Sequence, residues 1–284
     1  MKRVLTAAVL IPIVLLIVFR APMWLFAAFV GLVALLATLE YLGIATSYCG
    51  KPLRAATLTT IVLLFLYTTV AAGLSLPQAM SGFEATFFVV VIPLFFVVVM
   101  PFIFLAIGMD GANLRNGTLV AMTSYFALPY IGLSLWSLVL VRYMSSWFVA
   151  FVLVVVWVGD TCAYYVGRGL GKHLLAPRIS PKKTWEGSIA SLLGGVLAGA
   201  ALMHYCHQAP TGFTIGVGVL VNVAAQVGDL VESLMKRGAE VKDSGALLPG
   251  HGGILDRIDA LLFAAPVAAI LFAAGFFFGG THGK

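Results

Sequence analysis

Residues 23–47 read MWLFAAFVGLVALLATLEYLGIATS, an apolar run interrupted by a single charge at Glu40. An α-helix needs about 20 such residues to cross the roughly 30 Å hydrocarbon core of a bilayer. The whole chain has the same character, because 61% of its 284 residues are hydrophobic, 10% are charged and the mean hydropathy is +1.06. The sequence therefore predicts an integral membrane protein and excludes a soluble enzyme.

Apolar runs of this length recur along the chain and predict an all-α, polytopic membrane protein with about nine transmembrane helices. Runs such as Phe87–Ile92 are continuous and do not alternate as the strands of a membrane barrel would. Pro93, Pro101 and Pro129 are expected to kink the helices that contain them. The predicted spans are residues 4–19, 23–47, 57–74, 86–108, 118–141, 147–167, 187–206, 213–234 and 260–279.

The positive charges are distributed unevenly between the predicted loops. With a cytoplasmic N-terminus, 14 of the 17 Lys and Arg residues fall on cytoplasmic segments, and only Arg20, Arg142 and Lys284 fall outside. Cytoplasmic loops of membrane proteins carry such an excess. This pattern predicts a multi-pass protein of the cytoplasmic (inner) membrane with its C-terminus outside. It also accounts for the net charge of +6, so no nucleic-acid partner is expected.

The acidic residues indicate how the chain is organised. Residues 1–145 contain only Glu40, Glu84 and Asp110 as acids, and predict a transmembrane scaffold of about five helices that serves packing and faces lipid. Residues 146–284 contain the remaining acids and predict the catalytic part, with cytoplasmic polar loops at 168–186 and 235–259. Because an ionisable group inside a membrane costs about 2.5–3.5 kcal/mol, those that fall within predicted helices need a reason.

Asp160 is the first of these intramembrane acids. It lies on one helical face with Tyr164 and Arg168, at intervals of four residues. The spacing favours a carboxylate that lines a polar cavity; the alternative is an Asp–Arg pair near the helix end.

A polar stripe marks the predicted span 213–234. Asn222, Gln226, Asp229 and Ser233 recur at helical spacing, while the other faces are apolar, so the stripe is expected to face other helices or a hydrated cavity. For Asn222 and Gln226, interhelical hydrogen bonding is an equal alternative. Asp229 is the costliest member, and its position favours a functional carboxylate.

The following polar segment, Ser233–Asp259, packs four basic residues, four acids and five glycines together. Its stretch Gly250-His-Gly-Gly253 leaves backbone amides free to face an anion, although a glycine-rich loop can also simply begin a helix. Asp256 and Asp259 then lie three residues apart, where paired carboxylates can hold a hard divalent cation. This combination favours metal-assisted chemistry on phosphates.

The other polar loop contains Ser180-Pro-Lys-Lys-Thr-Trp-Glu-Gly187. Two ammonium groups and two hydroxyls suit an anionic substrate. The alternative for Lys182 and Lys183 is that they only orient the chain in the membrane, and Trp185 is equally suited to anchor the helix at the interface.

Together these stretches resemble the signature of the phosphatidate cytidylyltransferase (CDP-diacylglycerol synthase) family of bacterial type. The resemblance implies that CTP and phosphatidate give CDP-diacylglycerol and pyrophosphate, by metal-assisted in-line attack of the lipid phosphate on the CTP α-phosphate. The matching stretches are Ser233-x-x-Lys236-Arg237, Lys242-Asp243-Ser244-Gly245 and Pro249-Gly-His-Gly-Gly-Ile-Leu-Asp256-Arg257-Ile-Asp259, preceded by Gly159-Asp160-Thr161 and Ser180-Pro-x-Lys183-Thr184-Trp-Glu186-Gly187.

The resemblance also implies roles for particular residues. It implies Mg²⁺ held by Asp229, Asp256 and Asp259, and leaves open a second metal ion. The implied catalytic group is Asp229, Lys242, Asp243, Asp256 and Arg257. The implied substrate-binding group is Asp160, Ser180, Lys182, Lys183, Thr184, Glu186, Ser233, Lys236, Arg237, Gly250, His251, Gly252 and Gly253. The expected partners are CTP, phosphatidate and the bilayer, with the active site facing the cytoplasm; a homodimer is left open.

Two other functions compete with this interpretation. A CTP-dependent polyprenol kinase would share the membrane, the nucleotide and the metal. An ion-coupled transporter could use Asp160 and Asp229 near the middle of the membrane, but would not explain the polar loop around residues 250–253.

Overall fold

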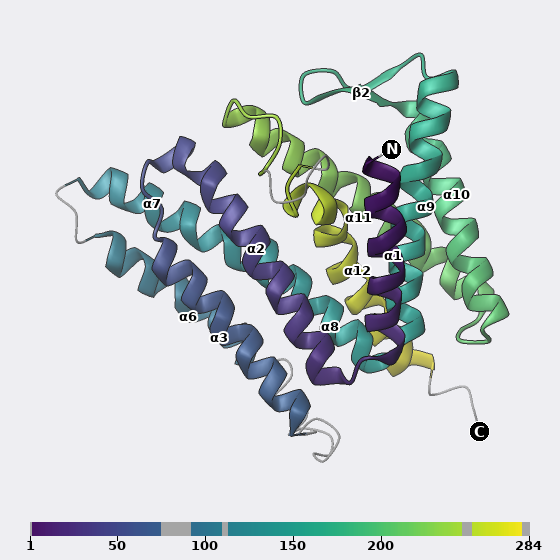
Figure 1. Cartoon of the computed structure of the whole chain (residues 1–284), viewed down its shortest axis with the longest axis horizontal. Helices are drawn as coiled ribbons and strands as arrows, with labels where there is room; N and C mark the ends of the chain where they lie inside the picture. Colours follow the sequence, from purple (N-terminus) through teal and green to yellow (C-terminus); the bar gives the residue numbers. More distant parts are fainter. Residues whose placement is uncertain (1, 75–91, 110–112, 246–251, 280–284) are drawn as a thin grey trace. The chain divides into compact units, whose positions relative to one another are not determined.

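Figure 1 shows the computed structural model of the protein, whose described residues form long helices and one short hairpin. The structure describes residues 2–74, 92–109, 113–245 and 252–279. Packing divides the chain into two compact units. The first consists of residues 1–139 and 239–256, and the second of residues 140–238 and 257–284. The predicted division near residue 145 concerns scaffold and catalysis, and it stays a prediction.

The first unit is built from long apolar helices. Its α2 packs against α3 and α7. The Tyr41 hydroxyl of α2 donates to the Thr123 carbonyl of α7 at 2.8 Å, and the Leu53 amide before α3 donates to the Ser124 hydroxyl at 2.8 Å. The helices of this unit are α1 (Lys2–Arg20), α2 (Met23–Cys49), α3 (Arg54–Gly73), α6 (Ile92–Gly108), α7 (Leu114–Ala127), the π-helical turn η2 (Leu128–Leu133) and the first half of α8 (Ser134–Met144).

The three predicted proline kinks have different outcomes. Pro129 lies in η2, where a wider helical turn accommodates a residue that has no amide hydrogen. Pro93 is the second residue of α6, a position at which the amide needs no partner inside the helix. Pro101 lies inside α6, and the helix continues through it. The regular α-helix is thus interrupted at Pro129, while a kink at each proline stays a prediction.

The second unit contains α9 (Ser146–Leu170), α10 (Trp185–Tyr205), α11 (Thr211–Gly238) and most of α12 (Leu255–Gly279). Small residues let α9 and α10 approach closely: a Cβ atom at Gly195 would come closer than 3.0 Å to the Val155 carbonyl. Aromatic rings fill the adjacent core, where Phe148 stacks on Phe272 with a centroid distance of 4.0 Å.

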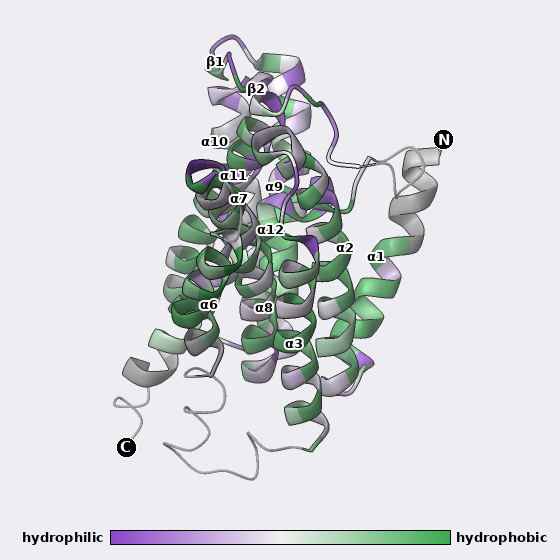
Figure 2. Ribbon diagram, turned by 90° about the vertical axis from the view of Figure 1, so that its left-hand side faces the viewer, coloured by the Kyte–Doolittle hydropathy of each residue, from purple (hydrophilic) through white to green (hydrophobic). Residues whose placement is uncertain are grey.

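A hairpin precedes α10 that the sequence analysis did not anticipate. Strand β1 (Leu174–Ala176) pairs antiparallel with β2 (Ser180–Thr184). The strands are too short for an alternating pattern to identify them, so this stretch was expected to be only a polar loop. In Figure 2 hydrophilic colouring collects around the hairpin, whereas the helices are mostly hydrophobic.

The predicted all-α, polytopic class is confirmed. Every predicted span overlaps an apolar helix, although the count of nine and the orientation stay predictions. Two of these helices are short, with apolar stretches at Leu10–Arg20 and Phe96–Gly108. In the described residues, seven are long and apolar enough to cross a membrane: Met23–Cys49, Arg54–Gly73, Leu114–Met144, Ser146–Leu170, Trp185–Tyr205, Thr211–Gly238 and Leu255–Gly275.

Candidate active site

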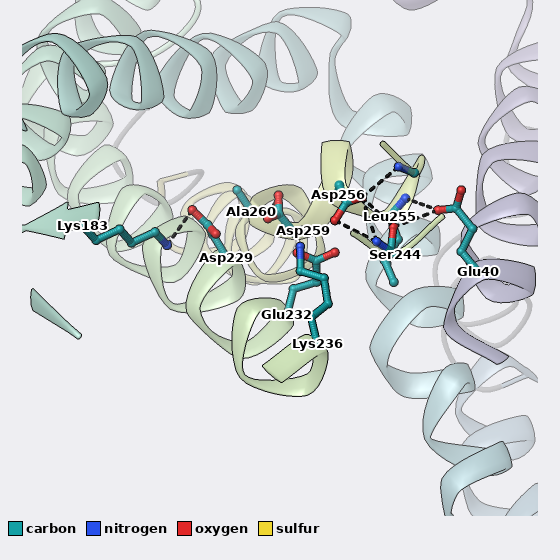
Figure 3. Close-up of polar contacts among 11 residues, drawn as sticks. Glu40, Lys183, Asp229, Glu232, Lys236, Ser244, Leu255, Asp256, Asp259 and Ala260 are labelled. Carbon is teal, nitrogen blue, oxygen red and sulfur yellow. Dashed lines mark hydrogen bonds and ion pairs between the residues drawn. The ribbon is translucent and has the colours of Figure 1, made fainter. Parts of the chain in front are cut away.

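An ion pair between β2 and α11 lies in the polar region of the second unit. The Lys183 ammonium contacts the Asp229 carboxylate at 2.6 Å, and both side chains are partly exposed, at 25% and 34%. Figure 3 shows the two side chains pointing toward each other. The hairpin therefore places Lys183, from the signature stretch 180–187, next to Asp229 of the polar stripe on α11.

Two further carboxyl groups lie within electrostatic range of this pair, and a third, Glu232, lies within range of one of them. Asp160 on α9 interacts electrostatically with the side chains of Asp229 and Lys183. Asp259 on α12 interacts in the same way with those of Asp229, Glu232 and Asp160. Helices α9, α11 and α12 thus contribute to one acidic cluster, which we define as Asp160, Asp229, Glu232 and Asp259.

Glu232 is a member of this cluster that the sequence analysis missed. Its side chain is fully buried, and its carboxylate contacts the Lys236 ammonium at 2.5 Å, one helical turn along α11. The signal was present in the sequence, because an acid in an apolar span with a lysine four residues later predicts a helical ion pair.

Carboxyl groups outnumber ammonium groups in this cluster. It contains four carboxyl groups, while Lys183 contacts Asp229 and Lys236 contacts Glu232. Among the described residues no three His, Cys, Asp or Glu side chains gather closely enough to form a complete metal site. Mg²⁺ fits such a partial set, because it takes one or two carboxylates and completes its oxygen ligands with water and substrate phosphates.

The other members of the polar stripe hold helices together. The Asn222 amide nitrogen donates to the Ser191 carbonyl and hydroxyl, both at 3.2 Å. The Gln226 amide donates to the Asn222 side chain at 2.7 Å and to the Ser188 carbonyl at 3.3 Å. The alternative of interhelical hydrogen bonding is thus what the structure shows for these two residues. Ser233 lies half-buried on the same helix.

Several residues of the 180–187 loop have local partners. The Thr184 hydroxyl caps α10 by accepting from the Gly187 amide at 3.2 Å. Glu186 contacts the His173 ring at 2.6 Å and so ties β1 to α10. Ser180 is half-buried in β2, and Lys182 is exposed. These contacts order the hairpin that carries Lys183.

A second polar cluster belongs to the first unit. The Asp256 carboxylate accepts hydrogen bonds from the Ser244 amide at 3.0 Å, the Ser244 hydroxyl at 2.9 Å and the Gly253 amide at 2.8 Å. Glu40 of α2 lies on the other side of Ser244 (Figure 3). Asp256 therefore organises the segment that ends in α12, and Asp259 follows one turn later on that helix.

The remaining predicted residues are placed as follows. Arg168 donates to the Tyr164 hydroxyl at 3.2 Å, and the described part of the chain shows no ion pair between Arg168 and Asp160. Gly252 has φ +78°, a conformation that favours glycine. Gly250 and His251 lie outside the described residues. The basic residues Arg237, Lys242 and Arg257 and the acid Asp243 are exposed, and Lys236 is half-buried.

The fold is that of a polytopic membrane protein, and its polar side chains gather in the clusters described above. The sequence profile of the Cytidylyltransferase family matches residues 1–274, so the chain belongs to that family and is a nucleotidyltransferase.

Individual relatives agree. A phosphatidate cytidylyltransferase of Pseudomonas aeruginosa is 34% identical over 283 residues, which cover 96% of this chain and 97% of the relative. Proteins of that name from Brucella suis and Staphylococcus aureus are 44% and 38% identical over 155 and 146 residues. These shorter matches cover 53% and 51% of this chain and 56% of each relative.

Proposed function

We propose that this protein transfers a cytidylyl group from CTP to phosphatidate, giving CDP-diacylglycerol and pyrophosphate. The observation that carries the proposal is the match to a phosphatidate cytidylyltransferase along 96% of the chain. In the reaction an oxygen of the lipid phosphate bonds to the α-phosphorus of CTP. The bond from that phosphorus to the bridging oxygen breaks, and pyrophosphate leaves with the electron pair.

The residues of the second unit suit this chemistry. Phosphatidate is already an anion at neutral pH, so its attack requires no base to remove a proton. The obstacle is repulsion between two polyanions, which positioned cations relieve most effectively where charge develops. Lys183 is held by Asp229 at 2.6 Å, and this contact keeps its ammonium in place for a phosphate oxygen. We assign Lys182 and the exposed Lys242 and Arg257 to the same task.

The acidic cluster is the proposed place for Mg²⁺. Asp229 and Asp259 would hold the ion, and its chemistry would be to neutralise phosphate oxygens and polarise the reacting phosphorus. Asp256 is the third proposed ligand, in addition to its role in ordering Ser244 and Gly253. Glu232 lies beside Lys236 and balances its charge rather than binding metal.

The remaining roles follow the resemblance. Thr184 and Glu186 would act on substrate through the hairpin they stabilise, and Ser180, Ser233 and Arg237 would line the path to the phosphates. We further propose that the polar loops face the cytoplasm and that the protein resides in the inner membrane. The homodimer stays a prediction, which light scattering in detergent would test.

The product distinguishes the proposed reaction from its rival. Purified protein would be given labelled CTP with either phosphatidate or a polyprenol. Release of pyrophosphate with phosphatidate, together with formation of a labelled lipid, is expected. Release of CDP with the polyprenol would instead indicate a kinase. Neither the kinase nor the transporter is favoured by the family assignment.

A further inference from the structure

Glu40 is the only charged residue of α2, a helix whose composition otherwise suits the interior of a membrane. Its side chain is 7% exposed, so the carboxylate is almost entirely removed from solvent. An ionisable group in such a place is costly unless other groups compensate it. Residues 1–145 were predicted to form a scaffold, and a scaffold alone gives no reason for a carboxylate at this position.

The partners of Glu40 come from the signature segment, more than 200 residues away in sequence. Carboxylate oxygen Oε2 accepts a hydrogen bond from the Leu255 amide at 2.8 Å and one from the Ser244 hydroxyl at 3.2 Å. Leu255 is the first residue of α12, and the first amides of a helix lack partners within it. Glu40 therefore supplies an anionic cap to α12 from a different helix.

Two signature glycines lie directly against the same carboxylate. A Cβ atom at Gly245 or at Gly253 would come closer than 3.0 Å to an oxygen of Glu40. A Cβ atom at Gly253 would also collide with the Ser244 hydroxyl. A side chain at either position would therefore have to displace the Glu40 carboxylate.

Glu40 and Asp256 together hold both sides of this segment. Asp256 accepts from the amides of Ser244 and Gly253, while Glu40 accepts from the Ser244 hydroxyl and the Leu255 amide. Figure 3 shows the two carboxylates approaching Ser244 from opposite directions. Glu40 is thus connected to the residues that flank the glycine-rich stretch and that lead into Asp256.

We propose that Glu40 is a positioning residue for the transferase reaction: it fixes Ser244 and the start of α12 at Leu255 and Asp256, so that α2 belongs to the catalytic apparatus. The inference rests on the proposed function, but it concerns this contact alone. Residues that orient a site without contacting substrate typically contribute about 10- to 100-fold to activity. Glu40→Ala should lower kcat by about that factor, measured per folded molecule.

The conservative variant separates positioning from charge. In Glu40→Gln the amide oxygen can still accept from the Leu255 amide, so we expect kcat within about 5-fold of the unchanged protein. A Gln variant as impaired as the Ala variant would contradict positioning through this hydrogen bond. Normal turnover per folded Glu40→Ala molecule, even with a lower melting temperature, would overturn the proposal.

The glycine contact allows a second, independent test. Gly245→Ala should lower activity about 10-fold or more, because its methyl group meets Glu40, but it should cost about 3-fold or less when Glu40 is already Ala. Gly43→Ala is the matched control. Gly43 lies on α2, as Glu40 does, and a Cβ there would meet open space, so this variant should keep normal activity. Additive losses at positions 40 and 245 would reject the contact.

The unchanged protein distinguishes this test from that of the proposed function. If it formed no CDP-diacylglycerol, the proposed function would fail. The melting temperatures in detergent of the unchanged protein, Glu40→Ala, Gly245→Ala and the double variant would then show whether Glu40 and Gly245 are in contact. If the unchanged protein is active and the activity losses at positions 40 and 245 are additive, only the positioning role is rejected.

Discussion

Asp229 and Asp256 have the same side chain but different surroundings. Asp229 faces an ammonium group and lies among other carboxylates, so its charge is available to a cation that can compete with Lys183. Asp256 accepts hydrogen bonds from two backbone amides and a hydroxyl. The first arrangement suits reversible binding of a metal or phosphate, and the second suits an ordered backbone.

The two aspartates should therefore respond differently to replacement. Asp229→Asn removes one charge from the acidic cluster without changing its shape, and we expect about a 100-fold loss of kcat at low Mg²⁺ that higher Mg²⁺ partly restores. Asp256→Asn removes a proposed ligand and also places an amide against the donors of Ser244 and Gly253, so higher Mg²⁺ should restore less of its activity than for Asp229→Asn. Turnover measured across an Mg²⁺ titration tests both expectations. Unchanged turnover of Asp229→Asn at low Mg²⁺ would exclude it as a ligand.

Lys242 and Arg257 are exposed and have cationic heads able to meet a leaving pyrophosphate. A group that neutralises charge developing in the transition state affects kcat, whereas one that holds only the bound substrate affects KM. We expect Lys242→Ala and Arg257→Ala to lower kcat about 100-fold. Kinetics with CTP and phosphatidate varied in turn would measure this, and a change confined to KM would assign both residues to binding.

At the scale of elements, contacts within one helix were predictable and contacts between distant segments were not. The stripe of Asn222, Gln226 and Asp229 follows from helical periodicity alone, and its face is polar as expected. The bond between Glu40 and Ser244 joins residues 204 positions apart, so no local pattern reveals it. The β1–β2 hairpin was missed for another reason, since its strands are too short to show an alternation.

Interhelical hydrogen bonds should contribute to stability rather than to chemistry. Asn222 is 1% exposed. Its replacement by Ala would remove the oxygen that accepts from the Gln226 amide and the amide that donates to the Ser191 carbonyl. Each such loss costs about 1–3 kcal/mol. We expect Asn222→Ala to lower the melting temperature in detergent while turnover per folded molecule stays close to normal. A large fall in kcat without loss of stability would instead place Asn222 in the reaction.

The cap of α10 offers a similar test for the hairpin. Thr184→Ala removes the acceptor for the Gly187 amide, which typically costs about 1 kcal/mol, and Thr184→Ser retains it. If Thr184 acts only through the cap, the Ala variant should melt earlier and keep its KM values for both substrates. A raised KM with unchanged stability would show that the hydroxyl meets substrate, as the resemblance implies.

At the scale of the whole molecule, the positive charges and the apolar helices together specify an orientation. The hairpin before α10 carries Lys172, Arg178, Lys182 and Lys183, whereas the connection after α10, residues 206–210, has no lysine or arginine. Helix α10 has 21 residues and a length of about 30 Å, enough to separate these two segments across the hydrocarbon core. From this difference in positive charge we propose that the hairpin lies in the cytoplasm.

Single cysteines on either side of α10 would test this orientation. Arg178 on the hairpin and Gln208 after the helix are both exposed, and replacing each by Cys in a variant without Cys49, Cys162 and Cys206 gives a matched pair. A thiol reagent that cannot cross membranes should label position 208 in intact cells and position 178 only after the membrane is opened. The two cysteines lie at opposite ends of α10. A difference in local exposure alone would therefore not exchange the labelling results of positions 178 and 208. Labelling of position 178 from outside intact cells would invert the proposed topology and remove the active site from the cytoplasm, where CTP is supplied.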